Sequence, residues 1–256
     1  MSRMRVTGRR VWVTGASAGI GRAVTVELVR RGATVIASAR NEPALSKLAR
    51  ECGGDRVLAL PFDVTDRPAH QRAADEIHRR LGGLDIAFFN AGTCEYVEVK
   101  KFDSALFERT IHTNFLSMVY GIEAVLPLLR QSPAPQLVGM SSTVAYGGLP
   151  RSEAYGASKA AIKNLFESLQ IDLLHEGISV SVVCPGFVRT PLTDRNDFPM
   201  PFRIEAHDAA RRIVDGIETK KPEIHFPRRL SLLFKLLTLV PSRLYIRLCA
   251  KMVTQP

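Results

Sequence analysis

Short apolar runs alternate with longer amphipathic stretches along most of the chain. The runs are rich in β-branched residues, as buried strands are, and the longer stretches place apolar residues at helical spacing. This pattern predicts strands at residues 11–13, 34–38, 57–62, 86–89, 137–140 and 180–184, with a last edge strand at 223–226. It predicts helices at 19–31, 42–51, 68–81, 103–130, 152–176 and 205–218.

The alternation of strands and helices indicates an α/β fold. Such a pattern forms a parallel sheet covered on both faces, and right-handed crossovers make it doubly wound. No internal repeat divides the chain before residue 227. We therefore expect a single Rossmann-type domain over residues 1–226, followed by an amphipathic helical extension over 227–256.

The composition is that of an ordinary globular protein. Of the 256 residues, 46% are hydrophobic and 23% are charged, which is enough for a core without disulfides or metals. The four cysteines and six histidines are scattered, so we expect free thiols, a reducing and cytoplasmic setting, and no metal site. The start of the chain does not read as a signal peptide, and no apolar run approaches the length of a bilayer span.

The net charge of +10 comes from the two ends of the chain. The first ten residues hold four arginines and no acid, namely Arg3, Arg5, Arg9 and Arg10. Residues 228–256 hold six cations and no acid, so the middle of the chain is neutral overall. No groove-reading element accompanies these cations, which argues against nucleic acid as a partner. Solvated termini and peripheral contact with the anionic inner face of a membrane are the two interpretations left open.

A glycine-rich turn follows the first predicted strand and opens the first predicted helix. A helix N-terminus carries unpaired N–H groups and partial positive charge, and glycines let the backbone approach a diphosphate closely. The strand–turn–helix context therefore predicts a dinucleotide site. Its residues are Gly15, Ser17, Ala18, Gly19, Ile20 and Gly21.

The end of the second predicted strand bears on the choice of cofactor. An acidic residue there would bind the 2′-hydroxyl of NAD, whereas a basic residue would accept the 2′-phosphate of NADP. The chain has Ser38, Arg40 and Asn41 there and no acid. We expect Arg40 to pair with the phosphate and Ser38 to hydrogen-bond it, which favours NADP(H). An ordinary surface arginine is the alternative.

Tyr155 and Lys159 are spaced so that both lie on one face of the predicted helix. A phenol with a pKa near ~10 is a poor proton donor or acceptor at neutral pH, and a nearby ammonium would lower that pKa. Ser142 lies just after a predicted strand, and strand ends of this fold converge on one crevice. The three side chains therefore predict acid–base chemistry on a carbonyl or alcohol.

In the order and spacing of these motifs, the chain resembles the short-chain dehydrogenase/reductase family over residues 8–226. Besides the glycine turn, the matching positions are Asp63 and Val64 (adenine contact), Asn90, Ala91 and Gly92 (the NAG motif), Asn114, Ser142, Tyr155, Lys159, and Pro185, Gly186, Val188 and Thr190 (the loop over the nicotinamide). The resemblance implies Tyr155 as the general acid or base, Lys159 as the holder of the nicotinamide ribose, Ser142 as the ligand of the substrate oxygen, and Asn114 as the holder of a proton-relay water. It also implies a homodimer or homotetramer formed through the helices near 103–130 and 152–176.

Two positions depart from the family pattern. Phe89 stands where many members have an asparagine before the NAG motif, which suggests an altered sheet contact. Ala18 stands where many NADP-binding members have a basic residue, so Arg40 must supply most of the phosphate selectivity.

The substrate side and the C-terminal extension carry less specific patterns. Residues 190–205 should form a lid, and its Phe198, Pro199, Met200, Pro201 and Phe202 suggest an apolar substrate, with ordinary loop packing as the alternative. Apolar and basic residues are combined over 230–240 and again over 242–252, where Leu244, Tyr245, Leu248 and Met252 share a helix. We expect these helices to be buried within or between subunits ahead of contact with a membrane through residues 228–253.

Together these patterns predict an NADPH-dependent carbonyl reductase that acts on a small, apolar carbonyl or alcohol substrate. Two alternatives stay open. One is a cofactor-binding or membrane-assembled protein with little turnover, and the other is an NAD-linked alcohol dehydrogenase.

Overall fold

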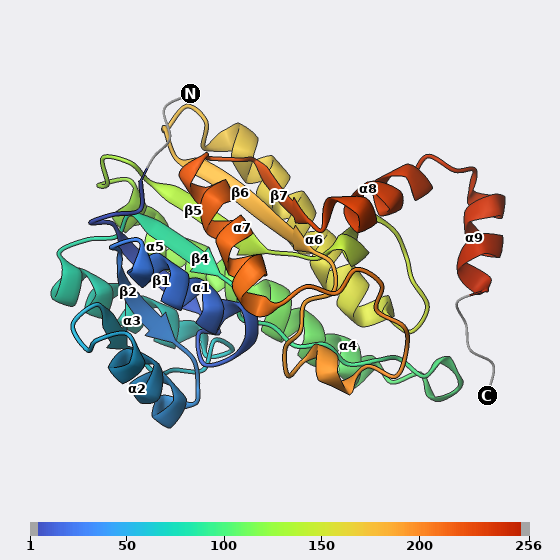
Figure 1. Cartoon of the computed structure of the whole chain (residues 1–256), viewed down its shortest axis with the longest axis horizontal. Coiled ribbons are helices and arrows are strands. Elements are labelled where there is room, and N and C mark those ends of the chain that lie inside the picture. The colour runs from blue at the N-terminus through green and yellow to red at the C-terminus, as the bar shows by residue number, and fades with distance from the viewer. Residues whose placement is uncertain (1–4, 252–256) are drawn as a thin grey trace.

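The computed structural model describes residues 5–251, and Arg3 and Met252 lie outside that range. Seven strands form one parallel sheet in the order β3-β2-β1-β4-β5-β6-β7 (Figure 1). Their bounds are β1 Arg10–Thr14, β2 Thr34–Ser38, β3 Val57–Ala59, β4 Ile86–Phe89, β5 Gln136–Met140, β6 Ser179–Pro185 and β7 Glu223–Phe226. The predicted doubly wound, Rossmann-type sheet is confirmed.

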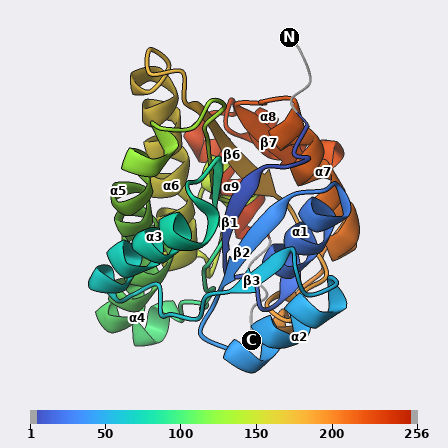
Figure 2. The same ribbon diagram turned by 90° about the vertical axis from the view of Figure 1, so that its left-hand side faces the viewer.

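Helices cover both faces of the sheet, as Figure 2 shows. One face is covered by α1 (Gly19–Arg30), α2 (Glu42–Glu51) and α7 (Ala206–Glu218), and the other by α3 (Arg67–Leu81), α4 (Ser104–Ile111), α5 (Ser117–Leu129) and α6 (Glu153–Asp172). Each face has its own apolar cluster, built around Val24, Leu28 and Ile213 on one side and around Ile122, Ile162 and Phe166 on the other. The strands are almost fully buried because both of their faces are packed.

Two predicted elements are interrupted. The helix expected at 103–130 is divided by a π-helical segment, His112–Leu116, between α4 and α5. The strand expected at 57–62 ends at Ala59, although Leu60 and Phe62 still donate to the carbonyls of Ala37 and Ala39. Pro61 between them has no N–H, so a regular ladder cannot continue there.

The C-terminal extension forms two helices, α8 (Arg228–Leu237) and α9 (Ser242–Ala250). In Figure 1, α8 lies beside β7, whereas α9 projects away from the sheet beyond the end of α6. Among the helices within residues 5–251, none is long and apolar enough to cross a bilayer.

Candidate active site

The glycine turn packs directly on the NAG segment. Asn90 Nδ2 donates to the carbonyls of Thr14 and Gly15 at 3.1 and 3.2 Å. Gly15 has a φ of +67°, and a Cβ on it would lie 2.8 Å from the Cα of Ala91. A Cβ on Gly21 would lie 2.3 Å from the carbonyl oxygen of Gly15. Glycine is therefore required at both positions for the backbone of this turn to fold so tightly.

The same turn meets the first helix and the loop after β6. Ala18 is the N-cap of α1 and offers no side-chain cap, so the first N–H groups of α1 are not capped by a side chain. A Cβ on Gly19 would approach Thr190 Cγ2 at 3.2 Å, which places Thr190 beside the turn. These residues fit the diphosphate of a dinucleotide, because the glycine turn leads directly into the N-terminus of α1, whose first N–H groups have no side-chain cap.

The groups at the end of β2 divide between the surface and the interior. Arg40 is 80% exposed in its side chain, and its Nη1 lies 3.8 Å from Asp63 Oδ2. Ser38 is fully buried, and its hydroxyl accepts a hydrogen bond from Trp12 Nε1 at 2.9 Å. Asn41 Oδ1 caps α2 by accepting from the Ala44 N–H at 3.0 Å. Of the two predicted phosphate ligands, Ser38 is thus buried and bonded to Trp12, and Arg40 is the exposed one.

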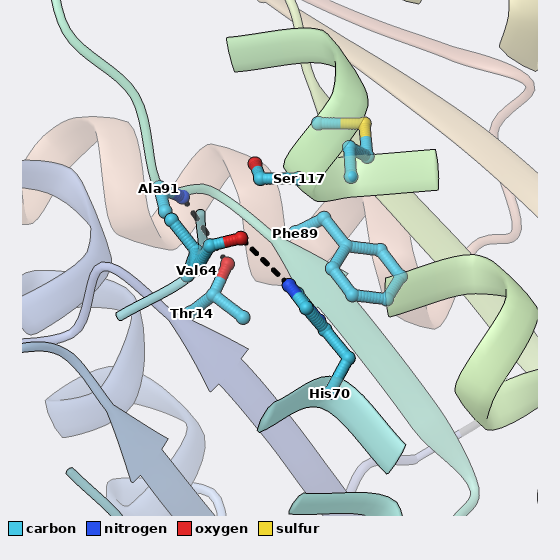
Figure 3. Close-up of a pocket in the computed structure, with 7 residues that line it drawn as sticks. Thr14, Val64, His70, Phe89, Ala91 and Ser117 are labelled. Carbon is cyan, nitrogen blue, oxygen red and sulfur yellow. Dashed lines mark hydrogen bonds between the residues drawn. The ribbon is translucent and has the colours of Figure 1, made fainter. Parts of the chain in front are cut away.

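A buried histidine that the sequence did not single out supports the adenine-side element. Figure 3 shows His70 of α3 pointing at the backbone of Val64, with Nε2 2.8 Å from the Val64 carbonyl oxygen. Burial lowers the pKa of His70, which favours the neutral ring. Its Nδ1 is buried and has no hydrogen-bond partner within residues 5–251, so we assign the ring proton to Nε2.

Phe89 takes up the space where the resemblance would place an asparagine. Its ring lies edge-on to Trp12, with centroids 5.5 Å apart. A Cβ on Gly121 of α5 would lie 2.2 Å from Phe89 Cε1. The altered contact is therefore apolar packing of the sheet on α5.

Lys159 and Asn114 meet beside Gly92. Lys159 is buried, and its Nζ donates to the Met140 carbonyl at 2.9 Å. Asn114, in the π-helical segment, accepts from the Thr93 N–H at 2.7 Å and donates to the Thr93 carbonyl at 3.0 Å and to Ser158 Oγ at 2.9 Å. A Cβ on Gly92 would lie 3.1 Å from Asn114 Oδ1 and 3.5 Å from Lys159 Nζ. Gly92 thus keeps open the space between the two polar groups.

Ser142 follows β5 and begins a short 3-10 helix, η3 (Thr143–Tyr146). Its hydroxyl donates to the Pro185 carbonyl at 3.4 Å and accepts from the Val144 N–H at 3.3 Å. Burial raises the pKa of Tyr155, while a hydrogen bond with Ser142 acts in the opposite direction. The predicted serine and tyrosine are therefore neighbours at the carboxyl edge of the sheet.

The expectation that Lys159 lowers the pKa of Tyr155 is wrong for this structure. The pKa of Tyr155 is raised, chiefly by burial, and Lys159 Nζ lies 5.6 Å from the centroid of the phenol ring. Burial also lowers the pKa of Lys159 itself, to about 8. Burial disfavours the charged phenolate more than the ammonium one helical turn away favours it.

The segment after the NAG motif contacts residues 190–205, for which the sequence predicts a lid. Cys94 lies near Tyr155 and Lys159, and burial raises the pKa of its thiol to about 11, so it is protonated at neutral pH. Tyr96 contacts Phe198 of the lid with ring centroids 5.8 Å apart, and Phe187 contacts Phe198 at 6.1 Å. Cys94 and Tyr96 were missed in the sequence because single residues after a motif carry no spacing signal.

α8 packs against the segments that follow β5 and β6. Gly186 donates its N–H to the Phe226 carbonyl at 2.7 Å, and a Cβ on Gly186 would lie 2.5 Å from Leu230 Cδ2. Tyr146, at the end of η3, hydrogen-bonds Glu223, and Lys235 Nζ of α8 lies 2.7 Å from the same carboxylate. The segment after β5, which carries Ser142, and the loop after β6, which carries Gly186, are therefore both supported by β7 and α8.

The fold and the site are those expected of a dinucleotide-dependent oxidoreductase. One edge of the doubly wound sheet carries a turn that fits a diphosphate, and Ser142, Tyr155 and Lys159 lie at the same edge. Residues 9–198 match the family model described as short chain dehydrogenase, and the chain belongs to that family. It is therefore an oxidoreductase of a family that uses a nicotinamide cofactor and small-molecule substrates.

Curated relatives and solved structures agree with this assignment. An uncharacterized oxidoreductase of Myxococcus xanthus is 36% identical over 239 residues, which cover 93% of this chain and 94% of that protein. The 11-beta-hydroxysteroid dehydrogenase-like 4A of Arabidopsis thaliana is 31% identical over 253 residues, which cover 94% of this chain and 83% of that protein. A short-chain dehydrogenase from Streptomyces avermitilis superposes with a TM-score of 0.82 at 26% identity, covering 96% of this chain and 97% of the other. A Burkholderia phymatum enzyme in complex with NAD gives 0.84 at 22% identity over 99% of both chains, a likeness of fold alone.

Proposed function

We propose that the chain is an NADPH-dependent carbonyl reductase that can also run the reverse oxidation. The observation that carries the proposal is the meeting of Ser142, Tyr155 and Lys159 at the sheet edge that also holds the glycine turn. When bound, the cofactor supplies or accepts the hydride.

In this proposal, Tyr155 is the proton donor in reduction. Burial raises the pKa of Tyr155, so the phenol is protonated at neutral pH and carries the proton that the carbonyl oxygen takes up as it gains negative charge. The Ser142 hydroxyl hydrogen-bonds that oxygen and orients it. The 2.9 Å bond to the Met140 carbonyl fixes Lys159 Nζ, which holds the ribose and completes the proton path toward Asn114.

NADP(H) is the proposed form of the cofactor because of Arg40. Its guanidinium is exposed beyond the end of β2, with only a long contact to Asp63, so it is free to pair with a 2′-phosphate. The remaining proposed cofactor contacts are the glycine turn, Asp63, Val64, the NAG segment, and Pro185, Gly186, Val188 and Thr190.

An apolar substrate is proposed from the aromatic residues near Tyr155. Tyr96, Phe198 and Phe187 form a row of aromatic contacts between the segment after the NAG motif and residues 187–198, and the neutral thiol of Cys94 lies beside Tyr155. The hydroxysteroid in the name of the Arabidopsis relative is in keeping with this class. We also propose that the chain forms a homodimer or homotetramer through α4, α5 and α6, which light scattering on the purified protein would test.

The test is the consumption of NADPH over a panel of apolar ketones and aldehydes by the protein and its Tyr155→Phe variant. We expect at least one substrate to be turned over, and kcat/KM to fall about 10²- to 10⁴-fold in the variant. Tyr120→Phe, in α5, is the matched control and should keep full activity. Full activity of Tyr155→Phe would contradict the proposed role. Tight cofactor binding without turnover would favour a cofactor-binding protein.

A further inference from the structure

The outer side of α8 is an apolar surface with no partner within residues 5–251. Leu230 and Ser231 are buried against the body of the protein. On the opposite side of α8 lie Leu232 and Leu236, and Leu239 follows just after the helix; Leu236 and Leu239 are 61% and 80% exposed. Burial against the parent domain, which the sequence suggested first, thus accounts for only one side of α8.

α9 combines an anchored side with a basic one. Tyr245 donates to the Gly148 carbonyl at 2.7 Å, and Cys249 one turn later is buried. Arg243, Arg247 and Lys251 project from the opposite side and are exposed. Leu244, Leu248 and Ile246 lie on the flanks between these sides, and all three are exposed.

Charge separates this extension from the rest of the protein. Residues 228–256 contain six cations and no acid. Lys235 pairs with Glu223 of β7, whereas Arg228, Arg229, Arg243, Arg247 and Lys251 form no ion pair with an acid within residues 5–251. Elsewhere some surface arginines, such as Arg130 and Arg151, have carboxylate partners, and the exposed arginines that have none, such as Arg50, lie on elements that also contain acids.

We propose that α8 and α9 form a docking surface for the anionic face of a lipid bilayer, in which their exposed leucines enter the interface and their cations meet the headgroups. Exposed aliphatic side chains and unpaired cations without any acid are the pattern that such a surface requires. A second copy of the chain fits less well. A two-fold contact through this surface would set the same cations against each other.

The docking surface adjoins the proposed active site. Tyr245 holds α9 against residues 147–148, which lie between Ser142 and Tyr155 in the chain. Leu230 of α8 packs on Gly186 of the loop after β6. A bilayer bound to α8 and α9 would therefore lie close to loops that border the substrate crevice. The proposal concerns binding to lipid and does not depend on the proposed reductase activity.

Flotation of the full chain with vesicles tests the proposal. Vesicles of phosphatidylcholine alone would be compared with an equimolar mixture of phosphatidylcholine and phosphatidylglycerol, at low and high salt. We expect flotation with the anionic vesicles, weakened by salt. The pair Leu232→Ser/Leu236→Ser and the pair Arg243→Glu/Arg247→Glu should each lower the bound fraction at least about tenfold.

Two matched controls separate docking from general surface effects. Ile171→Ser/Leu174→Ser removes apolar residues that are 72% and 70% exposed at the end of α6 and the turn after it. Lys47→Glu/Arg50→Glu reverses two exposed cations on α2. Both controls should float like the unmodified chain. Thermal melting identifies any variant that fails to fold. If one fails, the dependence of flotation on lipid charge and salt, measured with the unmodified chain, tests the proposal.

Three results would overturn the proposal. The first is no flotation of the unmodified chain with anionic vesicles. The second is equal loss of flotation in the control variants. The third is an oligomer that dissociates in Leu232→Ser/Leu236→Ser without any vesicle binding, which would assign the surface to contact between copies of the chain.

Discussion

The two ends of the proposed cofactor crevice hold their polar groups in opposite ways. At the adenosine end Arg40 is exposed and touches Asp63 only at 3.8 Å. At the end where the chemistry is proposed, Lys159 and Asn114 are buried, and Lys159 and Tyr155 have shifted pKa values. A group in water adjusts to its ligand at little cost, whereas a buried group is positioned in advance and costs stability. The adenosine end should therefore set preference, and the buried end should set rate.

The largest effect should come from Lys159→Met. Removing the buried ammonium takes away both the proposed ribose contact and the charge next to the proton path, so kcat/KM should fall about 10³-fold. Lys163→Met, one turn along α6 where the lysine pairs with Glu167, is the control and should lose less than about twofold. Steady-state kinetics with NADPH measures both. Equal losses in the two variants would contradict a specific role of the buried Lys159 ammonium.

A smaller effect should follow from Arg40→Asp. An aspartate would repel the 2′-phosphate and accept the 2′-hydroxyl, so the ratio of NADP(H) to NAD(H) affinity should change about 50-fold. The rate with saturating cofactor should change little, because the ion-pair contact of Arg40 is with Asp63 and not with Ser142, Tyr155 or Lys159. Isothermal titration with both cofactors measures the ratio. Equal affinities in the unmodified protein would contradict the assignment of NADP(H).

Lys159→Met should raise the stability of the fold although it lowers the activity. The pKa of Lys159 is about 8 in the folded chain against about 10.4 when unfolded, so below pH 8 the folded state carries the full cost of a buried ammonium. That cost shrinks as pH rises from 8 toward 10.4. Lys159→Met should therefore raise the free energy of unfolding at pH 7 by about 1–2 kcal/mol, after the lost bond to Met140 is counted. Urea unfolding at pH 7 and pH 10 checks this, and a less stable variant at pH 7 would refute it.

The smallest effect should come from His70. His70→Leu removes the donor to the Val64 carbonyl and should weaken cofactor binding about fivefold. His70→Gln keeps a donor and should retain most of the affinity. Fluorescence titration of the cofactor distinguishes the two. If both variants bind equally, the hydrogen bond does not position Val64.

The sequence was sufficient for features that depend on local pattern. Strands that are buried on both faces appear in the sequence as apolar runs. The glycine motif likewise predicts Gly15 and Gly21, where close backbone contacts leave no room for a Cβ. The sequence was insufficient where distant segments meet. No motif records the contact of Leu230 with Gly186, and even over the six residues from Val64 to His70 the sequence does not show that the ring reaches the carbonyl. The pKa of Tyr155 was misjudged because helical spacing shows that Lys159 is near but says nothing about burial.

The contacts between α8 and the proposed active site show that the motif residues alone do not form the whole site. Tyr146, Glu223 and Lys235 join η3 to α8, and Leu230 supports Gly186. A chain cut after residue 227 would keep every motif residue named above and would still be recognised as a member of the family. It would nevertheless lack the brace that the serine-bearing and nicotinamide-side loops share. For this molecule, an intact set of motifs is thus not the same as an intact enzyme.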